Sequence, residues 1–263
     1  MSRPEQLAPP EFFYNDTESF KYTSSSRVQH IQAKMTLRAL EILNLEAGKR
    51  HFVLDVGCGS GLSGEILSQE GHEWIGMDIS PSMLAIGLDR EADGDLFLSD
   101  MGDGIPFRAG VFDAAISISA IQWLCNADRA DVEPKLRLKR FFDTLYSSLK
   151  KGGKCVFQFY PSNENQIEQI TSSAKLAGFQ CGLVVDDPES KKNKKHYLVL
   201  QNGTGRALNL ANMELENTRT VKAKKRQEST KDYIMRKKEL MRKRGRVVAK
   251  DSKYTARKRR IKF

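Results

Sequence analysis

The chain has 263 residues, of which 40% are hydrophobic, and this is enough apolar material for one sizeable domain with extensions. It holds no uninterrupted run of 18 apolar residues, and its first residues lack the apolar segment of a signal peptide, so we expect no transmembrane helix, no secretion and no membrane partner. Four scattered cysteines without a C-x-x-C pair predict no zinc site and no disulfide framework. The formal net charge of +10 is unevenly distributed. Residues 203–263 carry 21 Lys and Arg against 6 Asp and Glu, so the rest of the chain has a net charge of −5.

The first 48 residues predict an irregular arm followed by a helix. Residues 1–14 are rich in proline and hold an aromatic cluster at positions 12–14. A helical pattern begins at Asp16, breaks at three serines and resumes over Arg27–Leu43, where apolar residues recur near a 3.6-residue period. Two interpretations of the arm stay open: it packs against the domain that follows, or it forms a lid over a ligand site there.

The stretch His51–Gly61, HFVLDVGCGSG, has the pattern of a strand, a tight glycine turn and the start of a helix. An apolar run leads to Asp55, and glycines follow at positions 57, 59 and 61. Glycine permits positive φ and lets a ligand lie directly against the backbone, and the helix that follows offers free N–H groups at its N-terminus. Because the spacing G-x-G-x-G differs from G-x-G-x-x-G, the turn favours a ligand other than a dinucleotide.

From Phe52 onward, strands alternate with helices, which predicts an α/β domain over residues 49–202 with a parallel sheet and helices on both faces. The first strand is predicted to end at Gly57, and the next strands to cover His72–Asp78, Asp95–Ser99, Phe112–Ser119 and Cys155–Tyr160. Helices are predicted up to about Glu70, from Pro81, over about Pro134–Lys150, where Gly152 and Gly153 stop the helix, and over about Asn163–Leu176. Two last strands, Phe179–Val185 and His196–Leu200, flank a charged turn.

An acidic residue follows each of the next two strands after the glycine turn. Asp78 lies about twenty residues past the turn, where a carboxylate grips a ribose diol. Asp100 and Met101 offer a carboxylate for an exocyclic amine and an apolar wall for an adenine ring. Together these strand ends predict a nucleoside site without a phosphate grip. The pattern resembles the class I S-adenosylmethionine-dependent methyltransferases, which implies a Rossmann-like, seven-stranded, mostly parallel sheet with one antiparallel strand.

The methyl acceptor is expected beyond the end of the fourth strand. Ser117, Ser119, Gln122 and Trp123 lie there, and Tyr160 after the fifth strand offers a second wall. Trp123 suits stacking on a base and suits the core of the domain equally well. The sequence lacks the Pro-Cys pair used for attack on a pyrimidine carbon, and also the proline turn that is common where amino groups of bases are methylated. A nitrogen with a free lone pair, such as guanine N7, needs only to be held in line with the methyl group.

Several stretches narrow the resemblance to the eukaryotic small-subunit (18S) ribosomal RNA guanine-N7 methyltransferases: LDVGCGSGLSG, GMDISPSML, GDLFLSDMGDGIPF, ISISAIQWLCNA and the final YTARKRRIKF. This resemblance implies methyl transfer from S-adenosyl-L-methionine to guanine N7 in 18S rRNA of the pre-40S particle, a part in ribosome biogenesis, and a small zinc-binding activator protein as partner. It also implies a location in the nucleus (nucleolus and nucleoplasm) and in the cytoplasm.

The same resemblance assigns roles to single residues. It carries cofactor binding onto Gly57, Asp78, Ile79, Asp100, Met101 and Ser117, and the strand-end argument adds Asp55, Cys58, Gly59 and Gly61. The residues expected to position the substrate, with no general base and no metal ion, are Ser119, Gln122, Trp123 and Tyr160.

The expected activator site lies on the third strand. In the class I topology this strand is at the edge of the sheet, and Leu96, Phe97 and Leu98 are three consecutive apolar residues on it. An uncovered apolar edge promotes aggregation, and addition of a strand from another protein covers it. We therefore expect the activator at this edge.

Residues 203–263 form a basic C-terminal extension. Clusters of Lys and Arg lie at 224–226, 236–238, 242–244 and 257–260, and charge pairs allow a helix over about Thr230–Arg244. Low apolar content predicts disorder before binding, and such clusters typically bind phosphates or act as nuclear import signals. Two alternatives stay open. One is a small-molecule methyltransferase, against which the basic extension argues; the other is a pre-ribosomal RNA-binding assembly factor whose methyltransferase activity is dispensable.

Overall fold

The structure is a computed structural model that describes residues 4–127, 133–190 and 193–203, and in the C-terminal extension residues 235, 238, 242, 248, 250 and 251. The chain divides into two compact units, Met1–Asn217 and Thr218–Phe263. The predicted boundaries at 48/49 and 202/203 stay predictions, and the helix predicted over Thr230–Arg244 lies largely outside the described residues. No helix within the described ranges is long and apolar enough to cross a membrane.

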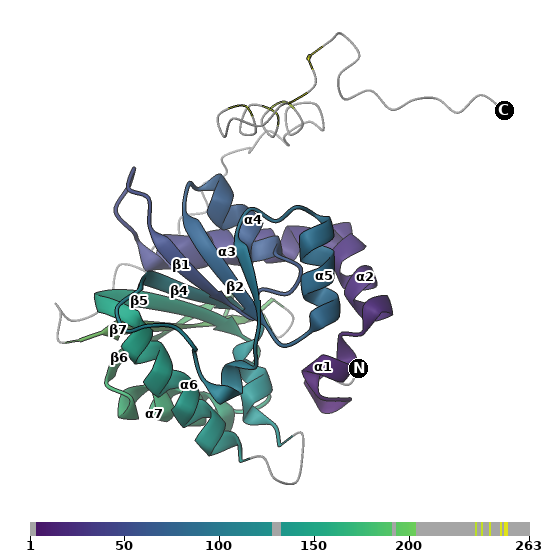
Figure 1. Ribbon diagram of the computed structural model, residues 1–263. Coiled ribbons are helices and arrows are strands. Elements are labelled where there is room, and N and C mark those ends of the chain that lie inside the picture. Colours follow the sequence, from purple (N-terminus) through teal and green to yellow (C-terminus); the bar gives the residue numbers. More distant parts are fainter. Residues whose placement is uncertain are drawn as a thin grey trace. The chain divides into compact units, whose positions relative to one another are not determined.

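Among the described residues, seven strands form one sheet in the order β3-β2-β1-β4-β5-β7-β6 (Figure 1). Neighbours from β3 to β5 are parallel, whereas β7 runs antiparallel to both β5 and β6. The predicted fold class, a seven-stranded and mostly parallel sheet, is therefore confirmed. The strands are β1 (Phe52–Val56), β2 (Glu73–Asp78), β3 (Asp95–Leu98), β4 (Phe112–Ile118), β5 (Leu149–Phe159), β6 (Phe179–Asp186) and β7 (Lys195–Asn202).

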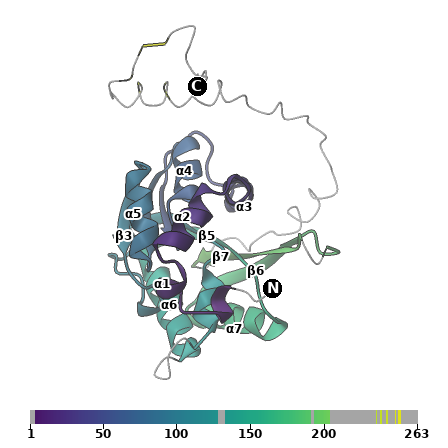
Figure 2. The same ribbon diagram turned by 90° about the vertical axis from the view of Figure 1, so that its right-hand side faces the viewer.

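Helices cover both faces of the sheet (Figures 1 and 2). One apolar core joins the sheet to α3 (Ser26–Leu43) and α4 (Leu62–Gln69), and the other joins it to α6 (Pro134–Ser148) and α7 (Glu164–Leu176). Because the central strands are buried on both faces, β1 and β4 are almost continuously apolar. The polar residues that matter for function lie at the strand ends.

The N-terminal elements begin at polar caps. Asn15 accepts hydrogen bonds from the backbone at the start of α2 (Asp16–Ser24), and the Ser25 hydroxyl caps α3. Before them lie a short 3₁₀ turn, η1 (Pro4–Gln6), and one helical turn, α1 (Pro10–Phe13). α2 packs beside α5 (Pro81–Asp89), which begins at a cap on Ser80 after β2. Within residues 4–14 of the arm these two short turns are the helical elements, and the longer helices begin at α2.

Gly152 and Gly153 do not stop a helix, and the prediction at this point is wrong. α6 ends at Ser148, and β5 starts at once because Leu149 pairs with Phe112 of β4. The register then shifts before Lys154 pairs with Ala114, so the two glycines lie in an irregular part of β5. Gly152 has φ +82°, and a Cβ at Gly153 would lie 2.9 Å from the Lys150 carbonyl oxygen, so this bend requires glycine. β5 therefore begins six residues before the predicted Cys155.

Candidate active site

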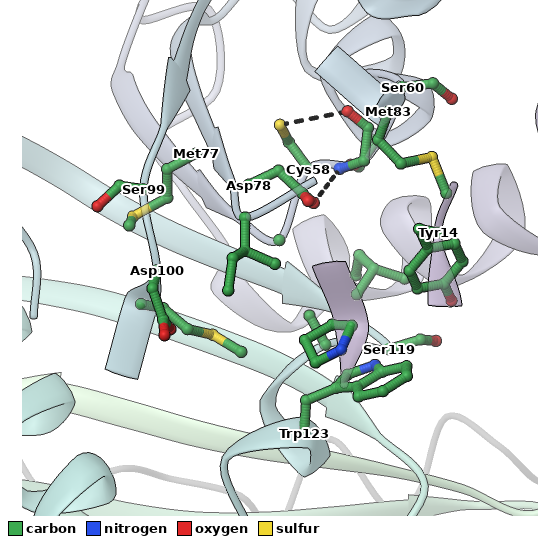
Figure 3. A pocket seen from close by; sticks show the side chains of 18 of the residues that line it. Tyr14, Cys58, Ser60, Met77, Asp78, Met83, Ser99, Asp100, Ser119 and Trp123 are labelled. Atoms are coloured by element: carbon green, nitrogen blue, oxygen red, sulfur yellow. Dashed lines mark hydrogen bonds between the residues drawn. The ribbon is translucent and has the colours of Figure 1, made fainter. Parts of the chain in front are cut away.

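The C-terminal ends of β1, β2 and β4 open into one pocket (Figure 3). It lies where the strand order reverses between β1 and β4, which is where ligands bind in open α/β sheets. Its walls come from the glycine turn, from the segments after β2, β3 and β4, and from the N-terminal arm. Of the predicted site residues, the pocket is lined by Gly57, Cys58, Gly59, Asp78, Ile79, Asp100, Met101, Ser119 and Trp123.

The glycine turn presents bare backbone to the pocket. The amides of Gly57 and Cys58 both donate to the Met77 carbonyl, at 2.8 and 3.1 Å. Gly57 has φ +71°, and a Cβ there would lie 2.3 Å from the Cβ of Ala120. Only glycine therefore allows the turn after β1 to pack against the segment after β4. Gly61, also predicted in the site, is the left-handed N-cap of α4 and does not line the pocket.

Asp78 joins the turns after β1 and β2. Its Oδ2 accepts from the Gly59 amide and its Oδ1 accepts from the Ser80 amide, each at 2.8 Å. Burial raises the pKa of this carboxyl, and the hydrogen bonds from the backbone of Ser80, Gly59 and Ile79 oppose that rise. Each oxygen keeps acceptor capacity toward the pocket, which is what a ribose diol would require.

Asp55 and Ser117 lie behind the pocket rather than in its lining. Asp55 is fully buried on β1, where its Oδ2 accepts from the Ser63 hydroxyl at 2.5 Å and its Oδ1 has no hydrogen-bond partner. Burial raises its pKa from 3.8 to about 7, against the effect of the Ser63 hydrogen bond. Ser117 is fully buried on β4 with its hydroxyl unpaired. Asp55 therefore joins β1 to α4 through Ser63.

Asp100 lies at the pocket wall in an ion pair that the sequence does not predict. The Nη2 of Arg137, on α6, lies 2.6 Å from Oδ1 and 2.7 Å from Oδ2 of Asp100. Oδ1 also accepts from the Gly102 amide at 2.7 Å. Met101 begins a short 3₁₀ helix, η2 (Met101–Asp103), and lines the same end of the pocket.

The N-terminal arm forms part of the pocket wall. Pro10, Tyr14 and Tyr22 line the pocket. The Ser80 hydroxyl donates to the Tyr14 carbonyl at 2.8 Å, and Thr23 donates to the Ser60 hydroxyl at 2.7 Å, so the segments after β1 and β2 both hold the arm. Burial raises the pKa of Tyr14, and it raises that of Tyr22 to about 12, so both phenols stay protonated at neutral pH.

The segment after β4 forms the opposite wall. Ser119 has φ +62°, a conformation that non-glycine residues rarely adopt, and three hydrogen bonds hold it there. Its amide donates to the Gln158 carbonyl at 2.9 Å, its hydroxyl donates to the Gln158 side chain at 2.6 Å, and the Gln122 side chain donates to its carbonyl at 2.9 Å. Gln122 thus supports Ser119 and does not itself line the pocket.

Trp123 and Tyr160 differ in position. Trp123, on the 3₁₀ helix η3 (Ile121–Cys125), lines the pocket and also packs against the arm, with its ring centroid 5.9 Å from that of Tyr14. The packing interpretation therefore describes the contact of Trp123 with the arm, and its stacking on a base stays a prediction. Tyr160 lies away from the pocket lining, and its hydroxyl contacts the Met35 sulfur at 3.4 Å.

Comparison with known protein families gives two matches. Residues 54–157 match the model of a family described as "Methyltransferase domain", and residues 186–261 match one described as "Methyltransferase involved in Williams-Beuren syndrome". The second match extends into the basic C-terminal extension.

Full-length relatives are similar to this chain. It is 65% identical over 277 residues to the 18S rRNA (guanine(1575)-N(7))-methyltransferase of Saccharomyces cerevisiae, with 100% of both chains covered. It is 54% identical to the 18S rRNA (guanine-N(7))-methyltransferase bud23 of Schizosaccharomyces pombe, also over 100% of both, and 47% identical to the mouse 18S rRNA (guanine-N(7))-methyltransferase over 99% of this chain and 98% of the relative.

Solved structures share the fold at low sequence identity. A S-adenosyl-L-methionine-dependent methyltransferase of Methanococcus maripaludis has a TM-score of 0.56 at 14% identity, covering 73% of this chain and 95% of that one. A phosphoethanolamine N-methyltransferase of Haemonchus contortus in complex with S-adenosylhomocysteine has a TM-score of 0.55 at 18% identity, covering 73% and 58%. A Haloferax volcanii methyltransferase in complex with the Trm112 methyltransferase activator has a TM-score of 0.50 at 16% identity, covering 71% and 98%.

Proposed function

This chain belongs to the 18S rRNA (guanine-N7)-methyltransferase family, and from this we propose that it transfers a methyl group from S-adenosylmethionine to N7 of a guanine in 18S rRNA. The observation that carries the proposal is the similarity over the full length of relatives that are named for this reaction. The pocket supports it, because it combines a bare glycine turn, two carboxylates and a tryptophan in one site. These features do not favour the alternative in which the chain is an RNA-binding assembly factor whose methyltransferase activity is dispensable.

The pocket residues fit S-adenosylmethionine, which supplies an electrophilic methyl group on a sulfonium sulfur. We assign the glycine turn at 57–59 to the methionine part and Asp78 to the ribose hydroxyls. Asp100 then accepts from the adenine amino group, and Ile79 and Met101 lie against the ring. Donors within the protein already bond the carboxylates of Asp78 and Asp100, but they do not use every lone pair. The assignment uses the lone pairs that remain.

The acceptor wall suits a base that already carries a lone pair. Ser119 and Trp123 line it, and neither side chain is a general base at neutral pH. Tyr14 on the opposite side has a raised pKa and keeps its proton. Guanine N7 needs no deprotonation, so the protein's contribution is to place the base and exclude water. Such placement supplies on the order of 7–11 kcal/mol of the barrier in well-oriented reactions.

The direct test maps N7-methylguanosine in small-subunit rRNA with and without the protein. Pre-ribosomal RNA from cells that lack the protein is incubated with S-adenosylmethionine and the full chain together with its activator. We expect one N7-methylated guanine, which borohydride and aniline cleavage would locate. A methyl group on a different atom, or none in a sample that binds cofactor, would contradict the proposal.

We also propose that the zinc-binding activator covers the edge of the sheet at β3. β3 pairs only with β2 in the described sheet, and Phe97 and Leu98 are 41% and 57% exposed. Leu88, on helix α5 that contacts β3, is also exposed, at 68%. Such an edge fits addition of a strand from another chain.

Phe97→Asp is expected to abolish co-purification of the activator. A charge at this edge opposes desolvation by a partner strand. Co-expression with tagged activator, followed by pull-down, measures this. Leu176→Asp is the matched control, because Leu176 is 85% exposed on α7, and α7 packs against β6 at the opposite edge of the sheet. A soluble Phe97→Asp chain that still binds the activator would show that the interface lies elsewhere.

We propose that the basic extension binds the RNA backbone, and that the same clusters direct the chain to the nucleus. Removing residues 222–263 is expected to weaken RNA association at least tenfold and to flatten its salt dependence. Neutralising Arg257, Lys258, Arg259 and Arg260 to Gln is expected to lower the slope of log affinity against log salt by up to about three, since each contact with single-stranded RNA contributes about 0.7. Titrations at several salt concentrations measure both, and an unchanged slope would count against phosphate binding.

A further inference from the structure

The Asp100–Arg137 ion pair places a cation in the pocket wall assigned to the adenine. One guanidinium nitrogen bridges both oxygens of Asp100, and the two side chains are only 16% and 19% exposed. The residues are 37 positions apart, on the segment after β3 and on α6, so this contact depends on tertiary packing. Arg137 itself lines the pocket.

Gly102 leaves room for this guanidinium. A Cβ at Gly102 would lie 2.1 Å from Nε and 2.4 Å from Nη2 of Arg137, so the arginine lies directly over the backbone of η2. Gly102 does not have a positive φ, so nothing in its own backbone conformation requires glycine. Glycine is needed at position 102 because the guanidinium of Arg137 occupies the space of a side chain. This is a second observation, besides the ion pair, that fixes the position of Arg137.

The consequence is chemical selectivity. With Arg137 donating to both oxygens and the Gly102 amide donating to Oδ1, the carboxylate is held in one orientation as an acceptor only. An acceptor at this place pairs with the amino group of adenine and repels the carbonyl oxygen of a 6-oxopurine. A site built to accept a hydrogen bond rejects a partner that cannot donate one, because its polar group is then left unpaired.

We propose that Arg137 is a positioning residue that makes the cofactor site selective for adenine over 6-oxopurines, acting through Asp100. This rests on the proposed function, because it assumes that Asp100 faces the adenine of S-adenosylmethionine. Arg137 does not contact the reacting atoms. Its loss leaves Asp100 in place but free to turn away from the base.

Binding of two product analogues by calorimetry tests the proposal without RNA. S-adenosylhomocysteine carries the amino group, and S-inosylhomocysteine carries a carbonyl in its place. We expect the full chain with its activator to prefer the adenine compound at least 30-fold. Arg137→Ala should weaken binding of the adenine compound at least tenfold, leave the inosine compound almost unchanged and so reduce the preference below fivefold. Arg137→Lys, which keeps a cation, should retain a larger share of the preference.

Two further variants separate selectivity from general loosening. Gly102→Ala should reproduce the Arg137→Ala result, because its Cβ displaces the guanidinium. Arg140→Ala is the control, since Arg140 lies on the same helix, pairs with Asp103 at 3.7 Å and is 62% exposed. If Arg137→Ala weakens the binding of both compounds equally, or weakens the binding of neither, this inference is overturned and the proposed function is unaffected. A wild-type chain that binds neither compound would contradict the cofactor assignment and both proposals.

Discussion

An Asp78→Asn variant is expected to bind S-adenosylmethionine at least 100-fold more weakly than the wild-type chain. Both carboxylate oxygens of Asp78 already accept a backbone amide, from Gly59 and from Ser80. An asparagine must turn its amide NH₂ toward one of these donors, so the turn that presents the glycines to the ligand is disturbed. The variant also loses charge-assisted hydrogen bonds to the ribose, each worth about 1.5–3 kcal/mol.

The measurement is calorimetric titration of the cofactor, with the melting temperature recorded for each variant. Asp89→Asn is the matched control, because Asp89 is an exposed aspartate at the end of α5, after the same strand. Affinity within threefold of the wild type in a folded Asp78→Asn chain would show that Asp78 does not hold the ribose. Loss of RNA methylation with continued maturation of the small subunit would show that binding and catalysis are separable roles.

The parts of the site that could be predicted are those where the chemistry is local in sequence. Gly57, Asp78 and Asp100 each lie at or within two residues of the end of a strand, and the alternating pattern of strands and helices brings such ends to one edge of the sheet. The glycine turn could be predicted for the same reason, because the glycines that adopt positive φ lie within a few residues of the strand that precedes them.

The parts that could not be predicted depend on contacts between distant segments. Tyr14 reaches the pocket because its carbonyl accepts from Ser80, 66 positions away, and no periodicity in the arm signals this. The conformation of Ser119 depends on Gln158. Gln158 lies on the next strand, whose apolar sequence predicts only a role in the core. The only sequence signal for the arm is its aromatic cluster at positions 12–14, and this is equally typical of core packing.

Asp55 leads to the second large prediction, because it is a fully buried acid whose pKa rises to about 7. Between pH 3.8 and about 7 the folded chain binds the Asp55 proton more tightly than the unfolded chain does. The contribution of Asp55 to the free energy of unfolding therefore falls as the pH rises through this window. At 1.36 kcal/mol for each pH unit, the ionised form costs up to about 4 kcal/mol above pH 7.

Asp55→Asn is thus expected to leave stability unchanged near pH 4 and to raise the free energy of unfolding by up to about 4 kcal/mol at pH 8. Asparagine keeps an oxygen for the Ser63 hydroxyl and removes the buried charge. Urea denaturation of both chains without cofactor, at pH 5, 6, 7 and 8, gives the difference, which should grow with pH.

Asp113→Asn serves as the opposite case for this test. Burial alone would raise the pKa of Asp113, but hydrogen bonds from Lys150 and the Phe52 amide outweigh it and lower the pKa. That variant should lose stability at neutral pH, and the loss should shrink as the pH falls below 4. If Asp55→Asn instead destabilises the chain equally at every pH, folding does not shift the pKa of Asp55, and its burial carries no cost that depends on pH.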